Sequence, residues 1–283
     1  SRGLRFFYRH PLGHFDRLLM QTEQDKERIE ALGAPKAEVF GNTKYQEAAD
    51  ALSVDPDHWR RELGIESGDA VIFVGSTRGE EDETPVLEGL KLISERVKVI
   101  WAPRHLERAP DLAKRIEQSL GKASFRSKGE KGDITILDTY GELSQAYCVA
   151  DVVIIGGGFA NLGGQNLIQP LAHGKPVIHG PHMQNFRHAA EEAGQAGATL
   201  TAASGEELAA HINSLLTDKN LRQKMGEAGA ALVRKHLGAA ERIASAIAEE
   251  AESAWKQKEG ERLRREERRK LREAEANTKR KGK

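Results

Sequence analysis

The stretch from Gly156 to Asn166 has the residue types best suited to bind a charged ligand. It contains five glycines and lies between a short apolar run, Val152–Ile155, and a helical pattern. Glycine lets backbone N–H groups approach a ligand closely, and the N-terminus of a helix favours an anion. The stretch therefore indicates a phosphate-binding loop, although a tight strand-to-helix connection would use the same glycines. It is not a P-loop, because no Gly-Lys-Ser/Thr follows, and it does not match the dinucleotide fingerprint.

Arg104 is the cation that could accompany such a loop. It follows a second apolar run, Val97–Trp101, after two intervening residues. A planar guanidinium makes two parallel, charge-assisted hydrogen bonds with a phosphate. The alternative is a surface ion pair with Glu107 or Glu80, and the residue alone favours neither.

Other reactive side chains carry weaker signals. The acidic run Glu80–Glu83 is interpreted as the N-terminus of a helix that opens near Thr84-Pro85, where negative charge is stabilising. The single cysteine, Cys148, excludes a disulfide framework and predicts a packed thiol. No Gly-x-Ser-x-Gly motif occurs. Four histidines cluster in the sequence, namely His173, His179, His182 and His188. They lack the His-Glu-x-x-His spacing of zinc enzymes, which argues against a metal site.

Strand and helix patterns alternate from about Val54 to Glu250. The strand segments are near-continuous apolar runs and not alternating ones, which is typical of a parallel sheet buried on both faces. The alternation predicts an α/β fold, a doubly wound Rossmann-like parallel sheet followed by C-terminal helices. Ligands of such sheets bind outside the carboxyl ends of the strands. Strands are expected at 71–74, 97–101, 134–137, 152–155, 176–178 and 198–200, and helices near 84–93, 112–120, 142–150, 166–172, 185–192 and after 204.

The two ends of the sequence do not fit this alternation. The spacing predicts an amphipathic helix over Phe15–Leu32, with Gly33 ending it. Residues 256–283 hold 13 Lys/Arg against 6 Glu and few apolar residues. This tail is predicted to be a solvated helix with Glu–Arg pairs, or disordered, or in contact with anionic lipid headgroups.

Composition narrows the classes of function. The 283 residues carry 43 Lys+Arg and 43 Asp+Glu, and zero net charge argues against a general nucleic-acid binder. No run of 18 apolar residues occurs, so no membrane span is predicted, and no signal peptide is visible. The length allows one large domain or two small ones. Because the first residue is Ser1, we expect that it is not a natural start.

Six short motifs, in this order and spacing, resemble the 3-deoxy-D-manno-octulosonic acid (Kdo) transferases of lipopolysaccharide synthesis. The resemblance covers residues 1 to about 240. The motifs are 41–45, 75–77 with 79–81, 103–105 with 107–108, 138–143, 163–166 with Pro170, and 173–177 with 180–182 and 185–186.

The resemblance implies a two-domain glycosyltransferase of the B type. It would transfer Kdo from CMP-Kdo to a lipid A precursor, without a cofactor or metal, at the cytoplasmic side of the bacterial inner membrane. Residues 1–45 would be the last helix of the acceptor domain and the linker, 46–250 the nucleotide-sugar-binding domain, and 251–283 a charged tail. The family's catalytic base, a Glu early in the first domain, has no counterpart here. The chain would therefore carry mainly the donor-binding half.

The resemblance also implies which residues meet the donor nucleotide. Arg104 matches the family's phosphate-contacting arginine, and Asn166 matches the asparagine of the Gly-Gly-His-Asn-x-x-Glu-Pro motif. The chain has Gln165 and Gln169 where the family has His and Glu, and glutamine accepts hydrogen bonds without charge. Arg104 and the glycine-loop amides would stabilise the departing phosphate. The expected donor site is Ser76, Thr77, Arg104, Tyr140, Gly141, Glu142, Gly156, Gly157, Gly158, Asn166 and Gln169.

Two other functions stay open. One is a transferase of the same architecture that uses a UDP- or GDP-sugar, which the two glutamines leave room for. The other is a non-catalytic nucleotide-sugar-binding module. The basic and aromatic segment 2–9 suits a membrane interface, or ordinary packing between two domains.

Overall fold

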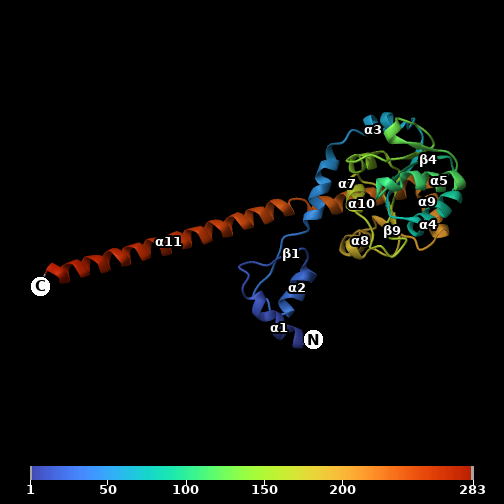
Figure 1. Ribbon diagram of the computed structural model, residues 1–283. Coiled ribbons are helices and arrows are strands. Elements are labelled where there is room, and N and C mark those ends of the chain that lie inside the picture. The colour runs from blue at the N-terminus through green and yellow to red at the C-terminus, as the bar shows by residue number, and fades with distance from the viewer. Residues whose placement is uncertain (1, 282–283) are drawn as a thin grey trace. The chain divides into compact units, whose positions relative to one another are not determined.

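The computed structural model describes residues 2–281. The chain forms two units: one holds the residues up to Thr43 together with those from Gly238 onward, and the other holds Lys44–Leu237. The second unit contains a seven-stranded parallel sheet with the order β5-β6-β4-β3-β7-β8-β9 (Figure 1). The strands are β3 (Ala70–Thr77), β4 (Val97–Pro103), β5 (Ala123–Phe125), β6 (Ile134–Ile136), β7 (Val152–Ile155), β8 (Val177–His179) and β9 (Thr199–Thr201).

Helices pack on both faces of this sheet, so successive residues of β3 enter opposite cores. Val71 and Phe73 belong to one buried cluster, and Ile72 and Val74 belong to the other. This double burial explains why the strands are continuous apolar runs. The first cluster includes residues of α3 (Pro56–Leu63), α7 (Ile168–Ala172), α8 (Arg187–Gln195) and α10 (Lys219–His236), and the second those of α4 (Glu80–Lys91), α5 (Ala109–Ser119) and α9 (Gly205–Thr217).

The direction of chain progression across the sheet reverses at β3. From β3 the chain proceeds to β4 on one side, and after β6 it returns to pair β7 with the other side of β3. Such a reversal is the point where open parallel sheets bind ligands, outside the carboxyl ends of the strands. The loops that follow β3 and β7 therefore face the candidate site.

The structure confirms the predicted fold class and the six predicted strands, and it adds one strand, β5, to their sheet. Strand β5 has only three residues, Ala-Ser-Phe, which is too short to produce a recognisable pattern. Gly174 follows α7 in the left-handed region (φ +66°), as expected of a helix end. Cys148 is buried, and burial raises the pKa of its thiol to about 11, which confirms a packed thiol.

The single helix predicted over Phe15–Leu32 is wrong. Helix α2 spans only Glu23–Ala31, because the hydroxyl of Thr22 accepts the N–H of Asp25 and caps the helix there. The residues before it form β1 (Leu19–Met20), which pairs in parallel with β2 (Glu38–Val39). Leu18 packs with Leu12 and Ala37 in a small core instead of along a helix face.

The unit that holds the two chain ends also contains α1 (Arg2–Leu12) and α11 (Ala239–Lys281). Helix α11 has 43 residues and includes the charged tail. Arg17 links the parts of this unit through ion pairs with Glu38 (3.2 Å) and Glu249 (3.3 Å). No helix in the described part of the chain combines the length and the apolar character that a membrane span requires.

Candidate functional site

Strand β3 extends further than predicted, so Ser76 and Thr77 lie in the strand and not in the loop after it. Ser76 has a φ of 62°, in the left-handed region, at a shift in register between β3 and β4. The hydroxyl of Thr77 accepts the indole N–H of Trp101 at 2.9 Å, and the residue is fully buried. The side chain of Thr77 is therefore not available to a ligand, contrary to the expectation from the sequence.

The amides of the glycine loop bind a carboxylate of the protein itself. Asp82, in the first turn of α4, is fully buried. Its Oδ2 accepts the N–H of Gly157 (2.5 Å) and of Arg78 (3.1 Å). Its Oδ1 accepts the N–H of Phe159 (3.2 Å) and of Ala160 (3.4 Å). The amide of Gly157 thus cannot serve a donor phosphate, which corrects the expectation for this position.

Sequence reasoning missed Asp82. The sequence predicted that the acidic run starts a helix, and the structure confirms this because α4 begins at Glu80. The prediction treated all four carboxylates alike, however. The signal that was present is an acid in the first turn after β3, beside a glycine loop predicted at the same edge. The contact joins residues 75 positions apart, which no local pattern reveals.

Close backbone contacts account for the glycines at this edge. A Cβ on Gly156 would lie 2.6 Å from the Cα of Thr77, and one on Gly180 would lie 2.2 Å from the carbonyl carbon of Gly158. Gly156 N–H donates to the carbonyl of Gly75 at 2.8 Å. The loops after β3, β7 and β8 are therefore packed backbone to backbone. The tight-connection alternative holds for most of the glycine loop.

Arg104 is an exposed arginine at the carboxyl edge of the sheet. Its backbone N–H donates to the carbonyl of Thr77 at 2.8 Å, which fixes the Cα beside the end of β3. Its side chain is exposed and forms no ion pair with any residue that the structure describes. Of the two carboxylates considered as its partners, Glu107 lies near His105 and Glu80 near Arg115. The guanidinium is thus free to bind an anion.

Asn166 and Gln169 lie at the start of α7, beside the glycine loop. The side-chain Oδ1 of Asn166 accepts the backbone N–H of Ile168 at 2.9 Å, so the side-chain NH₂ is the group left to face a ligand. Both side chains are half-buried. The amides of Gly158 and Gln165 have no hydrogen-bond acceptor within the described residues 2–281. These four groups, unlike the amide of Gly157, have hydrogen-bonding capacity that the described residues leave unused.

The loop after β6 divides into an open part and an anchored part. Tyr140 is 87% exposed, and Gly141 has a φ of +81°. Glu142 is anchored: it accepts the hydroxyl of Thr139 and pairs with Arg126 at 3.1 Å. This pairing raises the pKa of Arg126 above its ordinary value. Tyr140 can reach a ligand, whereas the carboxylate of Glu142 is already neutralised.

A buried ion pair supports the loop that carries Arg104. Arg108 and Arg115 contact the fully buried Glu83 of α4 at 3.5 and 3.1 Å. Burial raises the pKa of Glu83, and the two arginines oppose that rise.

Among the described residues, no three His, Cys, Asp or Glu side chains are grouped to hold a metal ion.

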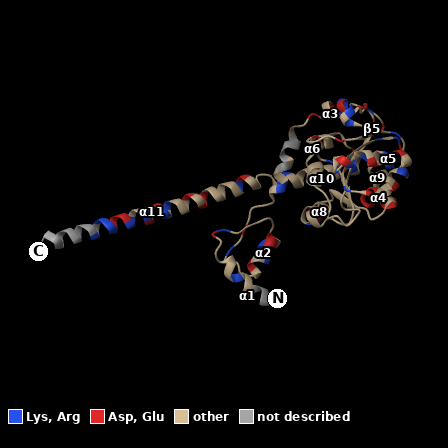
Figure 2. Cartoon of the chain, viewed as in Figure 1, with Lys and Arg blue, Asp and Glu red and all other residues tan. Residues whose placement is uncertain are grey.

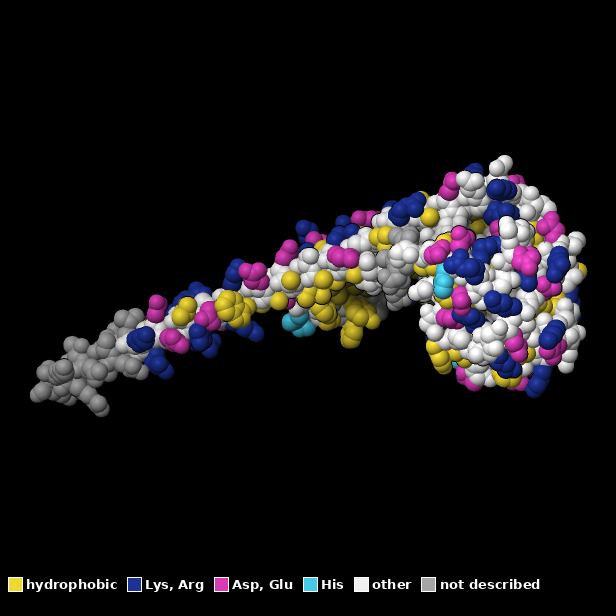
Figure 3. All heavy atoms as spheres, turned by 90° about the horizontal axis from the view of Figure 1, so that it is seen from above, with side chains coloured by type: hydrophobic (Ala, Val, Ile, Leu, Met, Phe, Trp, Pro, Cys, Tyr) yellow, Lys and Arg dark blue, Asp and Glu magenta, His cyan; other side chains and the backbone are white. Residues whose placement is uncertain are grey.

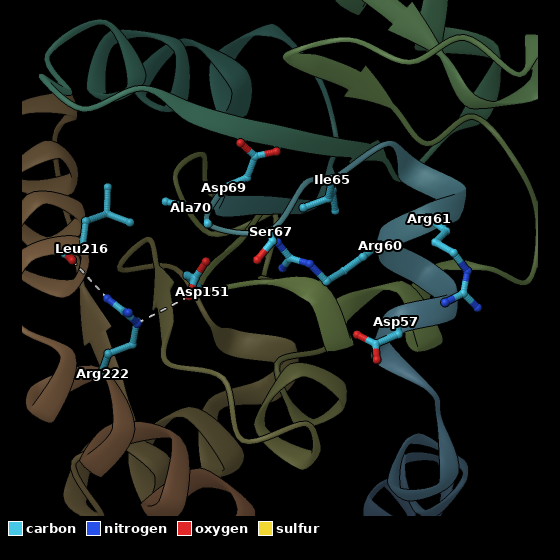
Figure 4. A pocket seen from close by; sticks show the side chains of 11 residues that line it. Asp57, Arg60, Arg61, Ile65, Ser67, Asp69, Ala70, Asp151, Leu216 and Arg222 are labelled. Carbon is cyan, nitrogen blue, oxygen red and sulfur yellow. Dashed lines mark hydrogen bonds and ion pairs between the residues drawn. The ribbon is translucent and has the colours of Figure 1, made fainter.

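A cavity of about 610 Å³ opens at the other edge of the sheet, where the strands begin (Figure 4). One ion pair joins two of its charged lining residues. Arg222 contacts Asp151 at 3.5 Å and donates to the carbonyls of Leu215 (2.6 Å) and Leu216 (3.1 Å). Asp151 in turn accepts the N–H of Val71 at 2.9 Å. We therefore place the candidate site at the carboxyl edge, around Arg104.

Comparison with known proteins gives consistent matches. A family model described as 3-deoxy-D-manno-octulosonic-acid transferase (kdotransferase) matches residues 1–47. The 3-deoxy-D-manno-octulosonic acid transferase of Bordetella pertussis is 36% identical over 251 residues, which are 84% of this chain and 58% of the relative. That of Chlamydia pneumoniae is 29% identical over 259 residues, 87% of this chain and 59% of the relative. The chain thus spans less than two thirds of these relatives.

The sheet unit also resembles a solved structure. The C-terminal CMP-Kdo binding domain of WaaA from Acinetobacter baumannii superposes with a TM-score of 0.56 at 22% identity, over 70% of this chain and 100% of that domain. At this identity the likeness establishes the fold. Taken with the sequence matches, it shows that most of this chain is similar to 3-deoxy-D-manno-octulosonic acid transferases.

Proposed function

We propose that this chain supplies the donor-binding half of a glycosyltransferase that transfers Kdo from CMP-Kdo to a lipid A precursor. Its relatives bear the name of that transferase, and the superposed domain is described as binding CMP-Kdo. The observation that carries the proposal is the unpaired guanidinium of Arg104 at the carboxyl edge of the sheet. An exposed arginine beside the point where the strand order reverses is suited to hold a nucleotide phosphate.

The proposed donor site is narrower than the one expected from the sequence. Arg104 binds the phosphate, and the amides of Gly158 and Gln165 lie on the same rim. Asn166 and Gln169 face the nucleoside from the start of α7, and Tyr140 covers it from the loop after β6. Asp82 fixes the conformation of the glycine loop by accepting its backbone N–H groups.

In the proposed reaction an acceptor hydroxyl attacks the anomeric carbon of Kdo, and CMP leaves with the electron pair of the broken bond. Negative charge grows on the phosphate, and Arg104 stabilises it. The proton of the hydroxyl goes to a base in the acceptor-binding domain. In this scheme residues 1–45 belong to that domain, 46–250 bind the donor, and 251–283 are an extension at the cytoplasmic membrane surface.

Calorimetric titration with CMP, UMP, UDP and GDP tests the proposal. We expect a preference for CMP and a loss of roughly 10- to 100-fold in affinity for Arg104→Ala, since one charge-assisted pair is removed. Arg61→Ala is the matched control, because Arg61 is an exposed arginine that lines the opposite edge. Preference for UDP or GDP would assign another sugar donor. An unchanged affinity in Arg104→Ala, or no binding of any nucleotide, would overturn the site.

A further inference from the structure

Helix α11 presents a continuous basic face. Lys258, Arg262, Arg265, Arg269 and Arg272 are spaced four, three, four and three residues apart, and all five are exposed. Residues three and four apart lie on the same side of a helix. The five cations, called here the basic stripe, therefore line one side over a length of roughly 21 Å. Figure 2 marks the Lys and Arg positions along this part of the helix in blue, and Figure 3 shows Lys and Arg side chains on its surface.

The cations of this part of the helix outnumber its glutamates. Residues 256–272 include nine Lys/Arg and four Glu, so a large positive excess remains. The glutamates lie beside the stripe, where they make local pairs such as Arg262–Glu259 at 2.6 Å. A helix stabilised only by pairs within itself would need more nearly equal numbers of the two charges. The excess points to an anionic partner outside the helix.

The same side of α11 becomes apolar toward its N-terminal part. Ile247, Ala251 and Ala254 continue the spacing of the basic stripe backward from Lys258, and Trp255 borders it. Ile247 is 61% and Trp255 is 64% exposed. Cations together with an exposed tryptophan are typical of helices that lie at a membrane surface. A nucleic acid would use the cations but gain little from the isoleucine.

We propose that the basic stripe of α11 binds the surface of an anionic phospholipid bilayer, with Trp255 and Ile247 entering the headgroup region. The choice of a lipid surface rests on the proposed function, whose acceptor is a lipid. Each Lys or Arg near an anionic surface strengthens binding by roughly a factor of five, and salt weakens the attraction. Binding of the chain should therefore require anionic lipid and decline with added salt.

Co-sedimentation with vesicles tests this face directly. The chain should bind phosphatidylglycerol–phosphatidylcholine vesicles and not vesicles of phosphatidylcholine alone. The triple variant Lys258→Gln, Arg262→Gln, Arg265→Gln should bind roughly a hundredfold more weakly. The matched control is Lys256→Gln, Arg264→Gln, Arg268→Gln, which changes the same residue types on other sides of the same helix. Glutamine keeps the helix propensity in both, and circular dichroism checks that α11 persists.

The control variant should retain most of its vesicle affinity. Equal losses in both variants, absence of vesicle binding, or equal binding to neutral vesicles would overturn the proposal. Displacement of vesicles by a small excess of duplex DNA would assign a nucleic acid as the partner instead. Both variants should keep native affinity for CMP. If the native chain binds CMP but not vesicles, only this inference is contradicted, whereas absence of CMP binding by the native chain would contradict the proposed function.

Discussion

The two edges of the parallel sheet treat charge in opposite ways. At the edge where the strands begin, Arg222, Asp151 and the last carbonyls of α9 satisfy one another around an open cavity. At the edge where they end, Asp82 is fully buried and Arg104 is exposed with no carboxylate partner in the described part of the chain. The contrast teaches that cavity volume alone does not identify the proposed donor site. We place that site at the edge where Arg104 stands beside fixed backbone with no carboxylate partner among the described residues.

The largest loss in the free energy of unfolding is expected from Asp82→Asn. The amide would place N–H groups against backbone donors that now bind a carboxylate, and each unsatisfied buried group costs about 1–3 kcal/mol. We expect the free energy of unfolding in urea to fall by at least about 3 kcal/mol and CMP affinity to fall with it. Asp111→Asn is the control, because that carboxylate is 66% exposed. A loss for Asp82→Asn as small as the control's would show that Asp82 does not organise this edge.

A smaller loss in the free energy of unfolding is expected from a substitution that separates two loops of the carboxyl edge. In Gly180→Ala the new methyl group would meet the backbone of Gly158, at a cost of about 2 kcal/mol in the free energy of unfolding. Gly194→Ala makes the same change within α8, where the nearest atom is 3.8 Å away. Alanine should stabilise the helix there by about 0.5 kcal/mol. Effects of the same sign in urea unfolding would contradict this account.

The opposite edge should contribute stability without contributing to nucleotide binding. Arg222→Ala removes the contact with Asp151 and two hydrogen bonds to helix carbonyls. We expect the free energy of unfolding to fall by about 1–2 kcal/mol while the affinity for CMP stays native. Titration of this variant beside Arg104→Ala measures the contrast between the edges. Weakened CMP binding in Arg222→Ala would move the site to the cavity of Figure 4.

The smallest effect on stability concerns two histidines, the buried His179 and the half-buried His173. His179 ends β8 and contacts the carbonyl of Gly180 at 2.8 Å, while His173 follows α7 and contacts the carbonyl of Ser144 at 2.7 Å. Burial lowers the pKa of both below the usual 6.5.

Because the folded pKa values of these two histidines are depressed, the unfolded chain takes up protons first as the pH falls through about 6.5. Stability should therefore be complete above that pH and decline below it. Urea unfolding of the native chain at about pH 7.5 and about pH 5.5 should show the decline. His179→Gln and His173→Gln should each reduce it. A decline of native size in the double variant would assign the acid sensitivity to other groups.

The sequence was most informative where burial is symmetrical. Val71–Val74 and Val152–Ile155 are apolar at every position because both faces of the sheet are covered, so their prediction depended on no partner. The short β5 and the start of α2 depended on tertiary contacts. Thr22 sets the true start of α2, and Leu18 leaves the predicted helix to join a small core.

Within the candidate site, Arg104 could be predicted because its chemistry follows from its residue type and its place after a strand. The roles of Thr77, Asp82 and Glu142 could not. Each is decided by a partner on another element: Trp101, the glycine loop, and Arg126. A residue pattern shows that a carboxylate is present, but only the assembled edge shows whether its charge is already occupied.

The position of β3 in the sheet also governs how the unit can be assembled during synthesis. Its partner β4 follows soon after it, but the contact of Val71 with Asp151 spans 80 residues. The half-sheet of β5, β6, β4 and β3 is therefore synthesised before β7 exists. Until then the central strand β3 is an apolar edge with unpaired N–H and C=O groups, the kind of edge that pairs with other chains. We expect the nascent chain to be open to such pairing until the ribosome has synthesised β7.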